Sequence, residues 1–406
     1  MSNIIIIGGG ASGLVAAIYA ARNKNKVTIL EHKDKIGKKI LATGNGKCNY
    51  TNLNQKAEHY RGNDNSFAMK VLSGFGAEQT IDLFRELGIY PKEKNGYVYP
   101  NSEQASSVVD VLRLELLQLK VRIITDTHVE QIFKLKDQFR IITNKETYFA
   151  DQVILAAGGC ASPNLGSDGS GYQLAKSLGH RIIKPLPALV QLKSNSKYFK
   201  TLSGVRTEAL VTLYVNEKFV TKEQGELLLA AYGVSGIPIL QISRFASKAL
   251  NENKKVHLII DYLPHMTAEE AYNLILYRIN RNPSRTVEEN LIGLLNNKLI
   301  YIGLIEAGVE PTKISSSIKN NQIKDLVKQL KEWRVIITEP NSFDQAQVSA
   351  GGVDTADINP VSLESKLMKG LYITGELIDV DGTCGGYNLQ WAWSTGALAG
   401  MNCGVK

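Results

Sequence analysis

The first 31 residues contain an apolar strand, a glycine-rich turn, a helix and a second strand in unbroken order. Ile4–Ile7 leads into Gly8-Gly9-Gly10-Ala11-Ser12-Gly13, an Ala-rich segment follows, and Val27–Leu30 ends at Glu31. In such a βαβ unit the first glycine permits the tight turn, the second admits a pyrophosphate, and the third lets the helix pack on the strand. The acid that ends the second strand can bind a ribose hydroxyl. The sequence therefore predicts an α/β domain that binds a dinucleotide; the alternative is a similar α/β unit without a nucleotide.

The length and composition are those of a globular protein of two or three domains. The chain has 406 residues, of which 44% are hydrophobic and 21% charged. No apolar run approaches the roughly 20 residues that span a bilayer, and the N-terminus has no signal-peptide pattern. Cys48, Cys160, Cys384 and Cys403 are far apart and form no C-x-x-C pair, which argues against structural zinc or a disulfide framework. We therefore expect a cytoplasmic protein with no metal site and no membrane partner.

The charge balance is mildly basic. The net charge is +8, from 47 Lys and Arg minus 39 Asp and Glu. Residues 188–333 hold 19 basic and 14 acidic side chains, a net of +5. A small excess of this kind is usually a solvated surface, but it also fits a polyanionic partner such as RNA. Five lysines between Lys33 and Lys47 lie close to the predicted pyrophosphate site and also fit neutralisation of cofactor phosphates.

The sequence pattern typical of a dinucleotide-binding domain begins at the N-terminus, stops near Pro185–Pro187 and resumes near Val335. Residues 77–88 and 103–119 predict helices, Asn95-Gly96 predicts a type I′ hairpin, and the strands 121–124, 129–135, 138–143 and 146–149 predict a β-meander before strand 152–156. The stretch 188–262 is strand-rich. From 267 to 333 it is helical, with capping boxes at Thr267/Glu270 and Thr286/Glu289. We therefore expect a FAD- or NAD-binding domain in two parts, 1–187 and 335–406, around insert subdomains at 188–264 and 265–334.

The C-terminal region favours FAD over NAD. A strand at 371–374 ends in Gly375-Glu376, and Gly382–Gly386 then opens a helix from Asn388 to Met401. A second glycine-rich helix start can face the flavin carbonyls, and its positive potential stabilises reduced flavin. The alternative is that these glycines only make turns. Because the chain has no second complete G-x-G-x-x-G, we expect NAD(P)H to act as a transient reductant without its own domain.

Two long motifs carry a family resemblance. Lys38–Asn49 and the stretch from Thr374-Gly375-Glu376 to Gly385-Gly386-Tyr387-Asn388-Leu389-Gln390-Trp391 resemble the signatures of the BaiN/RdsA flavoproteins, also labelled the aminoacetone oxidase family. The resemblance covers essentially the whole chain. It implies a Rossmann-like FAD-binding domain of the two-dinucleotide-binding flavoprotein type, interrupted by a small β-barrel and a helical subdomain.

The resemblance also implies the cofactor-binding residues. They are, by part of the cofactor, Gly8, Gly10, Ala11, Ser12 and Gly13 at the pyrophosphate; Glu31 at the adenosine ribose, with His32 beside it; Val129 at adenine; Lys39, Thr43, Gly44, Asn45, Gly46, Lys47, Cys48 and Asn49 around the ribityl chain and flavin; Ala157 and Gly158 near the cofactor; and Gly375, Glu376, Asp379, Gly386, Tyr387, Asn388, Leu389 and Gln390 at the isoalloxazine. The segment Leu228–Pro238 departs from the family pattern, which weakens any inference about the substrate from better-known members of the family.

The family is implicated in reducing conjugated carbon–carbon double bonds, in steroid enones and in the uracil ring of ribosomal RNA, and another member is described as an amine oxidase. In the reductases, reduced flavin delivers a hydride and an acid protonates the neighbouring carbon. We expect an FAD-dependent oxidoreductase with NAD(P)H as electron donor, and uridine in ribosomal RNA, giving dihydrouridine, as the leading substrate. The basic insert would then contact ribosomal RNA. Alternatives are small-molecule enones such as 3-oxo steroids or bile acids, aminoacetone oxidation with oxygen, and a flavin-bound RNA-binding or ribosome-assembly factor.

The catalytic residues are unknown from the sequence. Cys384, beside the flavin-facing glycines, is a candidate proton donor, and Tyr97 and Tyr387 are alternatives. Each of the three also fits a packing role. Cys48 fits a small structural residue better than a redox centre, and Trp391 and Trp393 fit helix packing better than base stacking.

Overall fold

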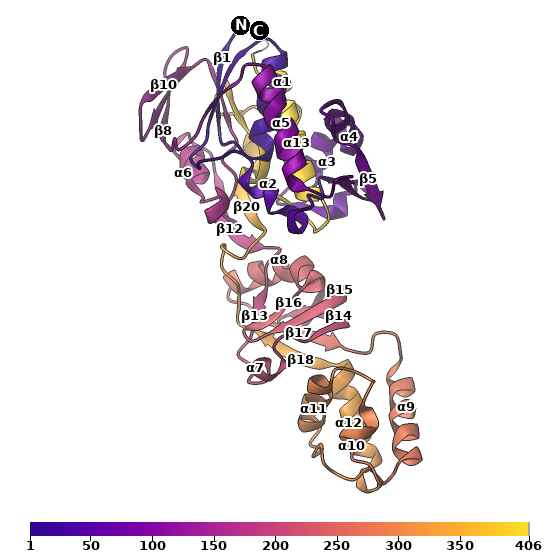
Figure 1. Ribbon diagram of the computed structural model, residues 1–406. Coiled ribbons are helices and arrows are strands. Elements are labelled where there is room, and N and C mark those ends of the chain that lie inside the picture. Colours follow the sequence, from indigo (N-terminus) through magenta and orange to yellow (C-terminus); the bar gives the residue numbers. More distant parts are fainter. Residues whose placement is uncertain (405–406) are drawn as a thin grey trace. The chain divides into compact units, whose positions relative to one another are not determined.

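The chain folds into two compact units in a computed structural model that describes residues 1–404 (Figure 1). The first unit comprises residues 1–187 and 346–404, and the second comprises 188–345. The predicted return to the first domain was at residue 335. The second unit extends to Gln345, since β18 (Trp333–Ile337) and the short strand at 339–340 after it both pair with strands of that unit.

A five-stranded parallel sheet forms the centre of the first unit. Its order is β21-β11-β1-β2-β7, and the strands are β1 (Asn3–Ile7), β2 (Lys26–Leu30), β7 (Arg122–Ile124), β11 (Gln152–Leu155) and β21 (Leu371–Ile373). Ile4 to Ile7 are at most 5% exposed, because helices cover both faces of a parallel sheet of this kind. We predicted strand 121–124 in the β-meander, and this was wrong. It pairs in parallel with β2 and extends the central sheet.

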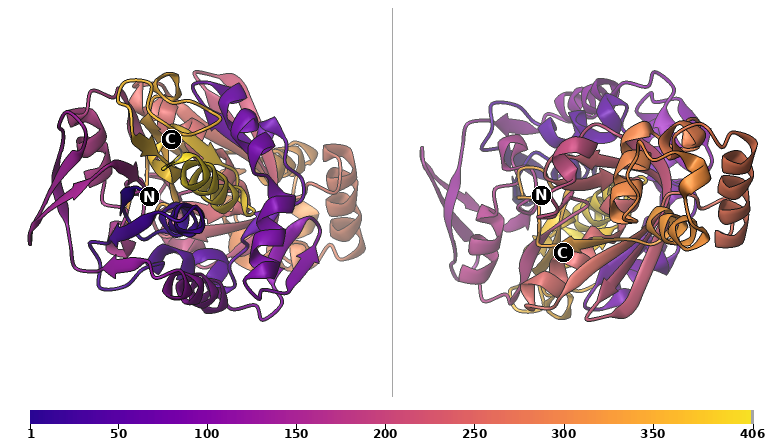
Figure 2. Two further views of the ribbon diagram at one scale, coloured as in Figure 1. Left: turned by 90° about the horizontal axis from the view of Figure 1, so that it is seen from above. Right: turned by 90° about the horizontal axis from the view of Figure 1, so that it is seen from below.

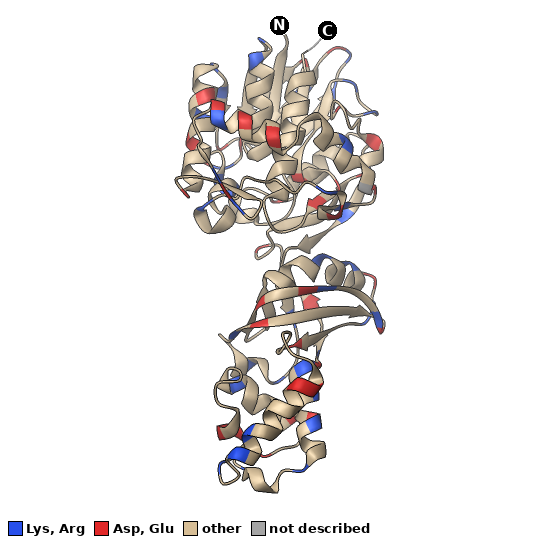
Figure 3. Ribbon diagram, turned by 90° about the vertical axis from the view of Figure 1, so that its right-hand side faces the viewer, with Lys and Arg blue, Asp and Glu red and all other residues tan. Residues whose placement is uncertain are grey.

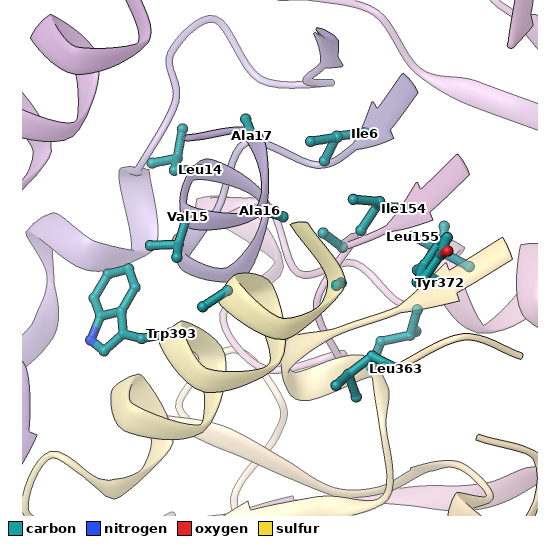
Figure 4. Packing of buried hydrophobic residues seen from close by; sticks show 14 of the residues in the cluster. Ile6, Leu14, Val15, Ala16, Ala17, Ile154, Leu155, Leu363, Tyr372 and Trp393 are labelled. Carbon is teal, nitrogen blue, oxygen red and sulfur yellow. The ribbon is translucent and has the colours of Figure 1, made fainter. Parts of the chain in front are cut away.

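Helices α1 (Ala11–Arg22) and α13 (Tyr387–Asn402) pack against each other although they lie at opposite ends of the chain (Figure 2, left). Their backbones approach closely at glycine. A Cβ on Gly396 would overlap the carbonyl oxygen of Ser12, and one on Gly400 would come 2.5 Å from that of Ala16. Figure 4 shows side chains from α1, α13 and the central strands gathered in one buried cluster. This packing fixes the two glycine-rich helix starts relative to each other.

The other helices of the first unit are α2 (Lys38–Leu41), α3 (Asn65–Gly74), α4 (Ala77–Glu86), α5 (Ala105–Gln118) and α6 (Ser170–Ser177). Four small sheets surround them: β3 (Thr51–Asn52) with β6 (Tyr97–Pro100) and β5 (Pro91–Lys94); β8 (Val129–Lys134) with β9 (Phe139–Thr143) and β10 (Thr147–Ala150); β4 (Tyr60–Gly62) with β22 (Val380–Gly382); and β12 (Ile182–Ala188) with β20 (Val348–Val353). The predicted hairpin at Asn95-Gly96 is confirmed, with φ angles of 53° and 85° joining β5 to β6.

A seven-stranded antiparallel sheet dominates the second unit. Its order is β18-β17-β14-β15-β16-β13-β19, with β13 (Leu192–Lys193), β14 (Arg206–Val215), β15 (Lys218–Ala230), β16 (Gly233–Gly236), β17 (Val256–Asp261) and β19 (Glu339–Pro340). Since β18 and β19 end this order yet are separated by a single residue in the chain, the sheet curls round on itself. Helix α8 (Ile237–Asn251), in a stretch predicted as strand-rich, packs on this sheet.

The second unit also holds a helical cluster with its own core. Its helices are α9 (Ala268–Arg281), α10 (Val287–Leu291), α11 (Asn297–Glu306) and α12 (Asn320–Lys331), and α7 (Phe199–Leu202) precedes β14. Both predicted capping boxes are confirmed: the Thr267 and Thr286 hydroxyls accept the amides of Glu270 and Glu289. Figure 3 shows basic and acidic residues mixed along these helices. Short 3-10 turns complete the fold at Thr43–Gly46, Ala57–His59, Pro163–Leu165, Ser315–Ser317, Thr355–Asp357 and Gly375–Leu377.

Within residues 1–404, no helix is long and apolar enough to cross a bilayer. The same residues contain no cluster of His, Cys, Asp and Glu suited to a metal ion.

Candidate functional site

The predicted cofactor residues gather at one edge of the parallel sheet. The carboxyl ends of β1, β2, β11 and β21 lead respectively into the Gly8–Gly13 turn, Glu31, Ala157-Gly158 and Gly375-Glu376. Strand β2, which follows β1 in the chain, lies on one side of β1. Strand β11 lies on the other side of β1. Ligands of open α/β sheets bind where the strand order reverses in this way.

The three glycines of the N-terminal turn have different surroundings. Gly8 has a φ of +106°, and a Cβ on Gly13 would overlap the carbonyl oxygen of Gly8. A Cβ on Gly10, by contrast, would meet nothing within 4 Å. Gly8 and Gly13 are therefore required by the protein's own packing. Gly10 leaves open space at the start of α1, where the fingerprint places a pyrophosphate. Ala11 and Ser12 form the first turn of that helix.

Glu31 holds the glycine turn from the end of β2. Its carboxylate is 7% exposed and accepts the backbone N–H of Gly9 at 2.7 Å and that of Lys33 at 2.7 Å. The carbonyl of Glu31 in turn accepts the amide of Thr127, and this contact brings the start of β8, with Val129, beside the Glu31-His32 segment. The His32 ring meets His128 edge-on at 5.9 Å. Its buried Nε2 makes no hydrogen bond and lies 3.7 Å from Asp168 Oδ2.

Replacing Glu31 with glutamine is expected to weaken FAD binding about tenfold or more. A side-chain amide presents one N–H group to the Gly9 and Lys33 donors, so one of the two hydrogen bonds is lost, at about 1–3 kcal/mol for an unsatisfied buried group. The measurement is a titration of the apoprotein by flavin fluorescence. Glu130→Gln, a change of an exposed side chain in β8, is the matched control, and equal affinities for both variants would contradict this role for Glu31.

Lys39 and Glu376 connect the two chain segments that form the first unit. Lys39 Nζ lies 2.7 Å from Glu376 Oε2 and donates to the carbonyl of Ala161 at 3.0 Å. Glu376 Oε1 accepts the amide of Ser349 at 2.8 Å, and the Ser349 hydroxyl accepts the amides of Cys160 and Ala161. The ion pair therefore ties helix α2 to the turns after β11 and β21.

The segment Ala157–Gly159 runs through this network. Gly158 has a φ of +76°, and a Cβ on Gly159 would come 2.7 Å from both Glu376 Oε1 and Ser349 Oγ. A Cβ on Gly375 would come 2.6 Å from Ser12 Oγ. Thr374 Oγ1, one residue earlier, is buried without a hydrogen-bond partner. The glycines at the ends of β11 and β21 thus permit backbone to approach polar groups of the site.

The loop from Thr43 to Asn49 has an unusual backbone. Gly44, Asn45, Gly46 and Cys48 all have positive φ angles between 53° and 82°, and the segment from Gly44 to Lys47 is exposed. Thr43 donates to the carbonyl of Ile40, and Lys47 pairs with Glu103 at 2.8 Å. Left-handed non-glycine residues of this kind concentrate at ligand sites. Asn49 ends the loop, and its buried Oδ1 has no hydrogen-bond partner.

Cys48 is expected to resist alkylation in the native protein. It is fully buried, and burial raises the pKa of its thiol to about 12, so the reactive thiolate is scarce near neutral pH. Peptide mapping after brief iodoacetamide treatment should find Cys384, which is partly exposed, modified before Cys48. Rapid labelling of Cys48 without denaturant would favour the redox reading of this residue.

The second glycine turn opens α13. Asn388 accepts the amide of Gly382 at 2.8 Å through Oδ1 and donates to its carbonyl at 2.9 Å. Asp379 is 2% exposed and accepts the amide of Asn63. Gly386 precedes the helix with a φ of +91°, and a Cβ there would come 3.0 Å from the unpartnered Asn49 Oδ1. The loop from Thr43 to Asn49 and the start of α13 are therefore in contact.

Two further members of the predicted set follow in the first turn of α13. Gln390 is fully buried and bonds with Thr51 and Ser394, so its amide holds α13 to β3. Leu389 is partly buried against the core. Gln390 thus supports the site from within the protein.

The residues at this edge fit FAD. Helices α1 and α13 both begin at glycine, without a side-chain cap and without an acidic residue in the first turn, whereas α9 and α10 are capped by threonine. The first N–H groups of an uncapped helix attract anionic or carbonyl oxygen. The open space at Gly10 suits a pyrophosphate, and the orphaned Asn49 Oδ1 beside Gly386 suits a ring N–H of a flavin.

Several residues of the site escaped sequence reasoning. Ser349 joins the Glu376 network across the chain, and Asn52 Nδ2 donates to the carbonyl of Gly385 at 2.9 Å. His59 stacks on Tyr387 with ring centroids 4.4 Å apart. Ser349 lies two residues before the pair Gly351-Gly352. That glycine pair is the sequence feature that could have indicated the segment containing Ser349. His59 carried no signal, because the pairing of β4 with β22 that brings it to Thr383 is long-range.

Comparisons with known proteins agree with this reading. Residues 2–402 match the family model described as the HI0933-like protein Rossmann domain. A Clostridium scindens protein named 3-dehydro-bile acid delta(4,6)-reductase is 46% identical over 402 residues, which cover 98% of each chain. Two proteins named ribosomal RNA dihydrouridine synthase are also similar. The one from Haemophilus influenzae is 31% identical over 401 residues, 97% of this chain and 96% of the relative. The one from Escherichia coli is 29% identical over 398 residues, 96% and 95% of the two chains.

Proposed function

Because the chain belongs to the HI0933-like family, we propose that this FAD-dependent oxidoreductase reduces the conjugated carbon–carbon double bond of a small-molecule enone, of the 3-oxo steroid or bile acid class. The observation that carries the substrate class is the 46% identity, over 98% of both chains, to a protein named as a bile acid reductase. The relatives named for ribosomal RNA are 31% and 29% identical. Uridine in ribosomal RNA, our leading expectation from the sequence, therefore becomes the second candidate.

Different segments of the chain would bind different parts of the cofactor. The turn from Gly8 to Gly13 and the start of α1 would bind the pyrophosphate, and Glu31, which holds that turn, would bind the ribose. Lys39 and Glu376 hold the ends of β11 and β21 together, where they would bind the ribityl chain, and Asn49 with the start of α13 would orient the isoalloxazine. When bound and reduced, FAD supplies the two electrons and the hydrogen that the β-carbon of the enone receives.

The protein must also supply a proton and return the cofactor to its reduced form. A side chain that touches the substrate donates the proton to the α-carbon. NAD(P)H is the proposed electron donor. It would visit the flavin transiently, since the sequence has one complete G-x-G-x-x-G.

The test compares substrates on the purified holoenzyme. Without oxygen, a 4-en-3-one steroid and a ribosomal RNA fragment are supplied in parallel, with NADH and with NADPH, and aminoacetone is supplied in a separate assay that contains oxygen. We expect the steroid to gain two hydrogens by mass spectrometry, with the highest kcat/KM of the three. A higher kcat/KM for RNA, with dihydrouridine as product, would replace this proposal by the second candidate.

The second candidate has one supporting feature besides the relatives. Residues 188–333 carry a net charge of +5, which suits a polyanion. Salt-sensitive RNA binding without any flavin reoxidation by RNA would instead favour an RNA-binding or ribosome-assembly factor. Peroxide release with aminoacetone would favour the oxidase.

A further inference from the structure

Gly385 lies between two tyrosine rings at the turn that opens α13. A Cβ on Gly385 would come 2.8 Å from Cε1 of Tyr97 and 3.4 Å from Cε2 of Tyr387. Asn52, which pairs with Tyr97 across β3 and β6, donates to the carbonyl of Gly385 at 2.9 Å. Both phenol rings are therefore held against the turn that leads directly to Gly386 and the unpartnered Asn49 Oδ1.

The two tyrosines are held in different ways. Tyr387 is 5% exposed, stacks on His59 at 4.4 Å and meets Tyr60 edge-on at 5.8 Å. Burial raises the pKa of Tyr387 to about 12, and the nearby Tyr97 and Glu58 act in the same direction. Tyr97 is 40% exposed at the start of β6, directly after the Asn95-Gly96 turn. Tyr387 is thus fixed in the protein interior, while the Tyr97 ring is partly open to solvent beside Gly385.

We propose that Tyr97 is the catalytic acid of alkene reduction. The inference rests on the proposed function, and it assigns the proton to a specific side chain. A phenol suits this task because its O–H group can donate a proton to a carbanion-like carbon. The sequence alone favoured Cys384 as much as Tyr97. The structure adds the contact of Tyr97 with the backbone at Gly385 and its exposure.

The reduction adds one hydrogen to each of the two alkene carbons. The β-carbon of the alkene gains one hydrogen and two electrons from reduced flavin, and the π electron pair moves toward the carbonyl. The α-carbon then forms a C–H bond with the phenolic proton as the Tyr97 O–H bond breaks. The flavin is oxidised by two electrons, the alkene is reduced by two, and the phenolate of Tyr97 regains a proton from water.

The experiment compares three holoenzyme variants with the unmodified protein: Tyr97→Phe, Cys384→Ala and Tyr90→Phe. Tyr90 is 76% exposed and lies just before β5, so it controls for loss of a hydroxyl from this region. We expect Tyr97→Phe to lower kcat about 10²–10⁴-fold with little change in KM. Its FAD content, its flavin absorbance and the spectral shift on binding the product should match those of the unmodified protein. Tyr90→Phe should retain kcat, and Cys384→Ala should lower kcat far less than Tyr97→Phe does.

The outcomes separate this inference from the proposed function. If the unmodified protein reduces the enone and Tyr97→Phe does so at the same rate, or if Cys384→Ala is the slow variant, Tyr97 is not the acid and the proposed function stands. If only uridine in RNA is reduced and Tyr97→Phe slows that reaction, the substrate proposal fails and the assignment of Tyr97 stands. Loss of FAD from Tyr97→Phe, or an unmodified protein that reduces no activated alkene, overturns the inference.

Discussion

Replacing Gly13 with alanine is expected to prevent stable folding of the FAD-binding unit, whereas the same change at Gly10 is expected to leave the fold intact and weaken FAD binding. The Cβ at residue 13 would overlap the backbone carbonyl of Gly8 and come 3.3 Å from Cβ of Ala156. Backbone in a packed sheet cannot shift cheaply, and overpacking of this kind costs about 3 kcal/mol or more. The Cβ at residue 10 meets no protein atom within 4 Å.

The two variants are measured in the same way. Urea unfolding of the apoproteins should give a strongly lowered midpoint for Gly13→Ala and an unchanged one for Gly10→Ala. Flavin titration of Gly10→Ala should show affinity lowered roughly 10- to 100-fold, since a methyl group in the path of the pyrophosphate costs about 1–3 kcal/mol. Full FAD affinity in Gly10→Ala would mean that the open space beside Gly10 is not the pyrophosphate site.

Replacing Lys331 with methionine is expected to destabilise the second unit by about 3 kcal/mol, the lower end of the range for removing one partner of a buried ion pair, because this pair is partly buried. Lys331 Nζ lies 2.8 Å from Asp261 Oδ2 and also donates to the carbonyls of Leu263 and Met266 at 2.8 and 2.6 Å. The two charged side chains are 13% and 17% exposed. Methionine would remove the ammonium donor from the Asp261 carboxylate and from both carbonyls, leaving the carboxylate with the amide of Leu263 and no opposite charge.

The control for this variant lies on the same helix. Lys328 in α12 is exposed, so Lys328→Met removes the same charge without a buried partner and should change the free energy of unfolding little. The double change Lys331→Met and Asp261→Leu should recover part of the loss, because it removes the uncompensated charge as well. Equal unfolding curves for Lys331→Met and Lys328→Met would contradict the account of this ion pair.

Local patterns of the chain predicted the features that depend on neighbouring residues. The run Ile4–Ile7, the glycine turn and the helix after it form β1 and α1, and the Asn95-Gly96 hairpin follows from the φ preferences of those two residues. The capping boxes at Thr267 and Thr286 depend on a spacing of three residues. Each of these signals is complete within a short stretch of sequence.

The features that the sequence did not reveal depend on distant contacts. Strand 121–124 resembles the meander strands after it, yet its place in the sheet is decided by pairing with β2. Helix α8 contains β-branched residues that favour strands, but Ile239, Ile242, Ala246 and Ala249 form a buried helical face against the curled sheet. Lys39 meets Glu376, 337 positions away. The roles of the predicted cofactor residues remain predictions, although the structure brings most of them to one edge.

The most direct test of the central claim mixes the fully reduced holoenzyme with a 4-en-3-one steroid in the absence of oxygen. Flavin absorbance reports the oxidation of FAD over time, and mass spectrometry reports the product. The account predicts that the flavin is reoxidised at a rate no slower than kcat and that one steroid gains two hydrogens for each FAD oxidised. A flavin that stays reduced until oxygen is admitted, with the steroid unchanged, would contradict it.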